Sequence, residues 1–358
     1  MEQRKKIFVS GKLSGTHTYK DDLISKENPD NIEKFLLDFC DFKLSKDMLA
    51  FSNIQEITDD NQALEMIKNI ESPCKLGIYF NKIFKKAFLS FSENKNIIIS
   101  INGFTIKAIF ELLSNSEITK YIINSFSTLN WIKEYGVEIK SLYDIPTFIK
   151  LLTNRVDPYK PEMEYLKEYT DYGYDNSEND EMTVACFCRV FGQILDEKSE
   201  EFGLLDASKA INENNEYELM ELNKIGEQDY TILEIAYNGL KEVFSERNKK
   251  DIKQFESKAY VLSPLKRIIP KYKNYNKEIA ENLESAYLED LTLKTLNELY
   301  NNNLPVKYDF ENEKYIIFCK AKNLNNIFSV TQAVFTQVFS GLFDKMPHLK
   351  IECDVMYE

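Results

Sequence analysis

The residue types that most often bind metals or act as nucleophiles are few and widely spaced in this sequence. The 358-residue chain has six cysteines and two histidines. Cys186 and Cys188 form its one close cysteine pair, and their spacing is typical neither of a zinc site nor of a disulfide framework. His17 and His348 lie far apart in the sequence. These patterns predict reduced cysteines in a cytoplasmic protein, without a zinc site.

Aromatic residues and one aspartate could contribute to binding, but each also has a structural interpretation. Asp144 stands where a predicted helix over residues 144–152 begins, and an aspartate there caps a helix more often than it binds a metal. We expect Trp131 to lie in the core rather than to stack on a base. The tyrosines between 159 and 174 are interleaved with acids, so we expect surface or partner contacts rather than stacking on single-stranded bases.

The charge of the chain limits its binding partners. The net charge is −13, which argues against tight, non-specific DNA binding because such binding needs cations that neutralise phosphates. Residues 83–86 and 266–277 are locally basic, and we interpret both segments as solvated faces. No signal sequence and no membrane-spanning run is recognised, so we expect no membrane partner.

The elements that would position these residues follow from the hydrophobic patterns. Short apolar runs punctuated by Asn and Ser predict an antiparallel meander, and helices and short strands follow it. A strongly apolar helix is predicted over Met182–Leu195 and an amphipathic helix over Tyr230–Phe244. The end of the chain reads as two strands, a helix and a strand. The meander runs are Leu76–Phe80, Ala87–Phe91 and Ile97–Ile101.

This order predicts an α/β fold, a mixed sheet flanked by helices, with a helical and small α+β extension at the C-terminal side. We divide the chain into an N-terminal lead-in (1–53), a main domain (54–250), a helical region (251–303) and a ββαβ unit (304–358).

Three segments of the main domain resemble a known family. Residues 112–121, Leu129–Ile139 and Leu142–Asp144 are similar to the middle of the 3′–5′ exonuclease (proofreading) domain of family A DNA polymerases, the DNA polymerase I family. In that family a helix ends at a Tyr-Gly-Ile/Val-Glu turn, which residues 135–138 match. The resemblance covers residues 54–155 and extends to about residue 250. It implies a ribonuclease H-like fold, whereas the short remainder of the chain leaves no room for a complete polymerase domain.

The resemblance also implies where catalytic carboxylates would lie. The family binds two divalent ions, Mg²⁺ or Mn²⁺, through several carboxylates, and the ions activate water and stabilise the leaving oxygen. The Asp-x-Glu pair of its first strand falls on Leu76–Asn81, which contains no acid, and its second carboxylate falls on Thr128. Asp144 matches a less central acid, and either Asp229 or Asp180 matches the last one. The resemblance therefore implies a degenerate exonuclease domain.

Three hypotheses follow. The leading one is a non-catalytic exonuclease-like protein of DNA replication or repair, or of a plasmid or phage process, that binds single-stranded DNA or a replication protein and needs no cofactor. The second is an active Mg²⁺- or Mn²⁺-dependent 3′–5′ exonuclease whose acids come from other positions. The third is an acidic interaction or structural protein that does not bind DNA. The acids named by the second hypothesis are Glu93, Asp144, Asp180 and Asp229.

Overall fold

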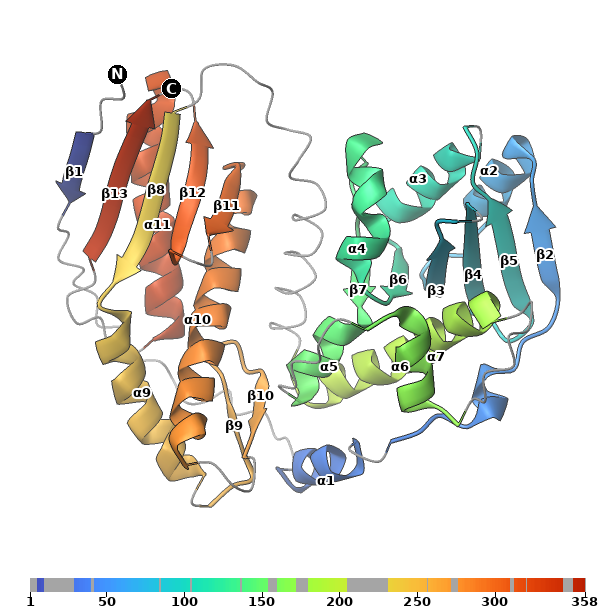
Figure 1. Cartoon of the computed structure of the whole chain (residues 1–358), viewed down its shortest axis with the longest axis horizontal. Helices are drawn as coiled ribbons and strands as arrows, with labels where there is room; N and C mark the ends of the chain where they lie inside the picture. The colour runs from blue at the N-terminus through green and yellow to red at the C-terminus, as the bar shows by residue number, and fades with distance from the viewer. Residues whose placement is uncertain are drawn as a thin grey trace. The chain divides into compact units, whose positions relative to one another are not determined.

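The computed structural model of the chain divides into two compact units, residues 27–223 and residues 1–26 together with 224–358 (Figure 1). The structure describes residues 5–9, 29–39, 42–153, 160–171, 180–204, 231–271, 276–343 and 350–357, except positions 84, 104, 136, 256, 310, 311 and 320. Within these residues, no helix is both long and apolar enough to cross a membrane.

The unit of residues 27–223 is built on a six-stranded sheet. Its order is β2-β5-β4-β3-β6-β7, and β4 alone runs against the others. The part β5-β4-β3-β6-β7 is the ribonuclease H-like arrangement, and β2 is added at its edge. The predicted meander and fold class are therefore confirmed. The strands are β2 (Ile54–Ile57), β3 (Cys74–Asn81), β4 (Lys86–Ser92), β5 (Lys95–Ser100), β6 (Ile118–Ile122) and β7 (Leu142–Asp144).

Helices cover both faces of this sheet because its strands bury both sets of alternating side chains. Ile78 and Phe80 of β3 join the core formed with α2, α3 and η3, whereas Tyr79 packs against the cluster that includes α7. The elements are α2 (Asp60–Lys68), α3 (Ile106–Ser114), α4 (Ser125–Leu129), the 3-10 helix η3 (Asn130–Tyr135), α5 (Ile145–Thr153), α6 (Glu162–Tyr169) and α7 (Asp180–Glu201).

Helix α7 lies unusually close to the sheet, and glycine makes this approach possible. A Cβ on Gly77 of β3 would lie 2.0 Å from the carbonyl oxygen of Ala185, and one on Gly192 of α7 would lie 2.4 Å from the ring of Tyr121. Backbone cannot move away as the end of a flexible side chain can, so residue 77 must lack a side chain. The contact fixes α7 across β3 and β6.

The tyrosine-rich segment before α7 was expected at the surface, and this was wrong for two of its members. Tyr165 and Tyr169 of α6 are buried. The Tyr169 ring lies 4.9 Å from that of Phe191 of α7 and 5.9 Å from that of Phe39 in α1 (Pro29–Phe39). Their spacing of four residues places both on one face of α6, and burial of that face outweighs the acidic residues between them.

The other unit contains a five-stranded sheet with the order β1-β13-β8-β12-β11 and antiparallel pairing throughout. Figure 1 shows α10 and α11 on the same face of this sheet. The predicted ββαβ order of the C-terminal residues is confirmed. The elements are β1 (Lys5–Val9), β8 (Thr231–Asn238), α9 (Leu240–Gln254), β9 (Tyr260–Leu262), β10 (Ile268–Pro270), α10 (Asn276–Asn301), β11 (Val306–Asp309), β12 (Lys314–Cys319), the 3-10 helix η5 (Ala321–Asn323), α11 (Leu324–Leu342) and β13 (Lys350–Tyr357).

The helix predicted over Tyr230–Phe244 was wrong, because residues 231–238 form β8 at the centre of this sheet. Leu233, Ile235 and Tyr237 are buried, which is a period of two. Gly239, with φ of 86°, then turns the chain into α9. Strand β8 pairs with β12 and β13, so it belongs with residues beyond 250 rather than with the main domain expected from the sequence.

The basic segment 266–277 is not simply a solvated face, because Arg267 is buried. Its Nε donates to Asp290 at 2.5 Å and one terminal nitrogen donates to Glu289 at 3.0 Å. The other terminal nitrogen donates to the carbonyl of Ala286 at 2.8 Å. A buried guanidinium needs such partners, and α10 supplies all three.

Candidate functional site

Polar side chains gather where the parallel strands β3, β6 and β7 end. β3 ends at Asn81 and β7 at Asp144, while α4 begins just after β6. Carboxyl ends of parallel strands meet at one edge of a sheet, which is where α/β proteins commonly bind ligands.

Asp144 is buried at this edge and both of its oxygens accept hydrogen bonds. Oδ1 accepts from the backbone N–H of Ser125 at 2.7 Å. Oδ2 accepts from the hydroxyl of Thr147 at 2.7 Å and from its N–H at 3.3 Å. Burial raises the pKa of Asp144, and these hydrogen bonds oppose the rise. The carboxyl group thus joins the first turns of α4 and α5, as a capping residue does.

Two glutamates that the sequence analysis did not single out lie at the same edge. Glu162 of α6 accepts from the hydroxyl of Thr128 at 3.3 Å, and Glu181 of α7 accepts from the amide of Asn81 at 3.1 Å. Burial raises the pKa of Cys188, and the negative charges of Glu162 and Asp144 add to this effect. The available sequence signal was Pro161, which often precedes or opens a helix and so would have placed Glu162 in a first turn.

This set of side chains is a poor match for a two-metal centre. Strand β3, where the family resemblance places two acids, has no acid and ends with the amide side chain of Asn81. Thr128, where the resemblance places another carboxylate, has a hydroxyl group instead. Asp144 uses both oxygens for N–H and O–H donors. Across the described ranges, no group of three Asp, Glu, His or Cys side chains is arranged to hold a metal ion. A hard divalent ion prefers several carboxylate oxygens, so these residues do not fit the ions that the family resemblance implies.

The other candidate acids are Asp180, which directly precedes Glu181 of the carboxyl edge, Glu93 and Asp229. Asp180 is buried and begins α7. Glu93 is exposed in the turn between β4 and β5, where its backbone carbonyl accepts from the N–H of Ser52 at 2.8 Å. Asp229 lies outside the described residues, and the helix it was expected to open is strand β8. The structure therefore brings Asp144, but not Glu93, to the carboxyl edge.

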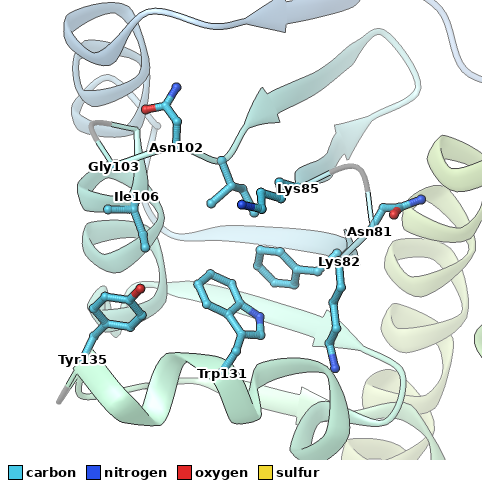
Figure 2. A pocket seen from close by; sticks show the side chains of 10 residues that line it. Asn81, Lys82, Lys85, Asn102, Gly103, Ile106, Trp131 and Tyr135 are labelled. Carbon is cyan, nitrogen blue, oxygen red and sulfur yellow. The ribbon is translucent and has the colours of Figure 1, made fainter.

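A pocket of about 370 Å³ opens beside this edge (Figure 2). Trp131 and Tyr135 of η3 and Ile106 of α3 form its apolar side, and Lys82 and Lys85 come from the turn between β3 and β4. Trp131 is half-buried and packs against the core of this unit, and Tyr135 is 57% exposed. The remaining lining residues are Phe80, Asn81, Ile101, Asn102 and Gly103.

The aromatic rings of the pocket hold one another in place. Trp131 meets Phe80 edge to face at 6.1 Å between centroids, and Tyr135 meets Trp131 edge to face at 6.4 Å. Tyr135 also rests on Phe110 of α3, at 5.3 Å. Such contacts fix ring orientation, so the pocket has rigid aromatic walls that leave the Tyr135 ring partly in solvent.

Comparisons with known proteins place the fold but not the activity. No protein-family model matches the chain, and no curated protein sequence matches it. The chain is similar to the POL domain of Pol1 from M. smegmatis, a structure in complex with DNA primer-template and dNTP. The TM-score is 0.61 and the identity 6%, over 85% of this chain and 99% of that one.

Two further structures show weaker similarity. They are RNase D from Escherichia coli, described as an exoribonuclease involved in structured RNA processing, and the catalytic core of RRP6 from Trypanosoma brucei. The identities are 12% and 8%, over 83% and 84% of this chain and 76% and 88% of those chains. Both TM-scores are 0.35, too low to support an argument.

The likeness to the POL domain shows a shared fold, because the identity is far too low to show more. It covers more of the chain than residues 27–223 alone can supply, so it extends into the unit that contains β8 and β12. The sequence resemblance had reached only about residue 250. The chain therefore shares its fold with this POL domain, and the likeness assigns no activity.

Proposed function

We propose that this protein is a non-catalytic, nucleic-acid-binding relative of DNA polymerase I, acting in DNA replication or repair or in a plasmid or phage process. The observation that carries the proposal is the edge where β3, β6 and β7 end. There the positions expected to bind metal present an amide and a hydroxyl, and Asp144 caps two helices.

The shared fold supports nucleic acid as the partner. The structure most relevant here, the POL domain of Pol1, is described in complex with DNA primer-template and dNTP. Function by fold alone is a weak argument, but the locally basic turn at residues 82–86 gives it a chemical basis in an otherwise acidic chain.

The absence of catalysis can be tested with an end-labelled single-stranded DNA oligonucleotide and Mg²⁺ or Mn²⁺, with EDTA as control. We expect no shortening even at high protein concentration. Shortening from the 3′ end that EDTA abolishes would contradict the proposal. In that case Glu162→Gln and Glu181→Gln would show whether the acids at the carboxyl edge hold the metal.

Binding requires a separate measurement. We expect fluorescence anisotropy to show that labelled single-stranded DNA or primer-template binds, and that affinity falls as salt rises because counterions are released. Equal concentrations of bovine serum albumin, another acidic protein, provide the control. No binding at low salt would reject nucleic acid as the partner and favour the acidic interaction protein.

A further inference from the structure

We propose that the pocket between η3, α3 and the β3–β4 turn binds a single nucleotide unit, with the base against Trp131 and Tyr135 and the phosphate at Lys82 and Lys85. This inference deepens the proposed function. It rests on the proposed function in one respect, which is that we expect the nucleotide to belong to a DNA strand. A DNA strand and a free nucleotide both offer the same chemical groups, an aromatic base joined to a phosphate.

The pocket is separate from the acids at the carboxyl edge. Phe80 of β3 faces the pocket and belongs to the core with α2, α3 and η3. Gly77 and Tyr79 of the same strand face α7, whose first turn carries Glu181. Alternation along the strand thus directs the pocket to one face of the sheet and the α7 contact to the other. Asn81, the last residue of β3, lies where the two meet.

The apolar side of the pocket suits a planar base. Trp131 and Tyr135 present large rings that other rings hold in place, so little side-chain entropy remains to be lost on binding. Ile106 lies beside Tyr135 in Figure 2. Stacking of a base on such a ring is favourable for every base, since each has a π face.

The opposite side suits a phosphate. Lys82 and Lys85 are exposed, and none of the 10 lining residues is acidic. In Figure 2 the end of the Lys85 side chain lies above Trp131, whereas the Lys82 side chain extends away from Lys85. Among the described residues Lys85 makes no ion pair, whereas the next residue, Lys86, is paired with Glu56 at 2.7 Å. Lys82 donates one bond to the carbonyl of Ser127, and its ammonium carries two further donors.

Both turns that frame the pocket are fixed by their own side chains. The N–H of Ile83 donates to the side chain of Asn81 at 3.0 Å. Asn102 and Thr105 each accept from the other's backbone N–H at 3.0 Å. Lys85, with φ of 49°, accepts from the N–H of Ile101 at 2.6 Å and so joins the two turns. The walls are therefore formed before a ligand arrives, which lowers the cost of binding.

Size and charge together favour a nucleotide over an acidic peptide. A volume of about 370 Å³ lies near the lower end of small-molecule sites, enough for one base and its sugar but not for several side chains. An acidic side chain would satisfy the lysines but leave the aromatic walls uncovered. A nucleotide satisfies both sides at once.

Trp131 is the single tryptophan of the chain, so its fluorescence reports on this pocket directly. The full chain would be titrated with dAMP, with a 5′-phosphorylated oligo(dA), with adenosine and with inorganic phosphate. We expect dAMP and oligo(dA) to quench the emission to saturation. Adenosine should bind about three- to tenfold more weakly than dAMP because it lacks the phosphate contacts.

Variants assign the two halves of the pocket. Lys85→Gln and Lys82→Gln are each expected to weaken dAMP binding about three- to tenfold and to reduce its salt dependence. Tyr135→Leu should weaken dAMP and adenosine alike. Lys68→Gln removes an equally exposed lysine from α2 that does not line the pocket, and it should leave binding unchanged. Circular dichroism and thermal unfolding would identify any variant whose fold has changed.

The outcomes separate this inference from the proposed function. If oligo(dA) binds more tightly than dAMP, the ligand of the pocket is part of a DNA strand. If the two bind equally, the ligand is a free nucleotide. Both results support nucleotide binding in the pocket. No quenching by dAMP or oligo(dA) at millimolar concentration overturns it, as does adenosine binding as tightly as dAMP with no effect of the lysine variants. A polyglutamate peptide that displaces dAMP and binds more tightly would replace it with an acidic protein partner. DNA binding in the anisotropy assay that survives loss of the dAMP signal would reject the pocket and retain the proposed function.

Discussion

Two buried aspartates, one in each unit, are accommodated in different ways. Asp290 in α10 accepts from Arg267 and from the N–H of Leu265 at 2.8 Å, so its negative charge has a buried cation as partner. Within the part of the chain that the structure describes, Asp144 accepts from the uncharged donors of Ser125 and Thr147. Burial therefore raises the pKa of Asp144, whereas the charges of Asp290 and Glu289 outweigh burial and raise the pKa of Arg267.

The difference teaches how acids are used in this protein. Each aspartate joins elements distant in sequence: Asp290 connects α10 to the β9–β10 turn, and Asp144 connects α5 to α4. Each carboxylate thus has a structural role in holding two elements together. The largest consequences of removing them should therefore appear in stability.

Breaking the ion pair is expected to have the largest effect. Arg267→Met keeps much of the side-chain volume but leaves Asp290 buried without its cation, which costs about 3–5 kcal/mol. Urea unfolding of the full chain would measure it. Arg267→Met together with Asp290→Leu should recover part of the loss. If Arg267→Met alone were as stable as the wild type, the pair of Arg267 and Asp290 would not be buried in solution.

Asp144→Ala is expected to destabilise by about 2–3 kcal/mol, because the N–H of Ser125 and the hydroxyl of Thr147 lose their acceptor. Thr147→Val removes one of these bonds and should cost about 1 kcal/mol. Urea unfolding of both variants tests whether Asp144→Ala loses more stability than Thr147→Val. Equal losses would mean that the bond from Ser125 contributes nothing.

The pH dependence of stability tests the environment of Asp144. The folded protein holds a proton on Asp144 more tightly than the unfolded chain does, so folding takes up a proton between the two pKa values. The contribution of Asp144 is complete below its unfolded pKa and is lost as the pH rises through the folded pKa. The stability difference between wild type and Asp144→Asn should thus shrink from acidic to neutral pH. A difference that grows instead would mean that the hydrogen bonds lower the pKa.

The smallest effect is expected for an exposed pair. Lys198 and Glu201 in α7 lie 2.6 Å apart, with side chains that are 37% and 43% exposed. Lys198→Gln should change stability by about 0.5 kcal/mol or less because solvent screens the pair. Thermal unfolding would show nearly the same transition as wild type. A larger loss of stability would show that solvent exposure does not predict how much an ion pair stabilises this protein.

Local patterns in the sequence predicted much of the fold. The apolar runs gave β3, β4 and β5, the continuous apolar stretch gave α7, and the final ββαβ order was correct. Strand β8 was missed because Leu233, Ile235 and Tyr237 fit a period of two, while Ile232, Ala236 and Leu240 also fit a helix. Its pairing with strands more than 70 residues away decided the outcome.

The candidate site was less predictable because long-range contacts form it. Asp144 was correctly placed at the beginning of a helix, but the contact of Asn81 with Glu181 spans 100 residues. Burial of Tyr169 and Arg267 likewise depends on α7 and α10, which no local pattern of charge reveals. Trp131 was expected in the core, and the pocket that exposes it arises only when η3, α3 and the β3–β4 turn meet.

The pairing of β1 with β13 has a consequence for how the protein is made. Lys5 lies opposite Val355, so β1 pairs with a strand that is translated long after it. Residues 27–223 lie between them in the chain and can complete their own sheet while the ribosome is still translating. Strand β1 cannot pair until β13 has emerged. A ribosome stalled before residue 350 would thus display a complete ribonuclease H-like sheet, whereas the five-stranded sheet would lack β13. Chaperones would be expected to recognise this form.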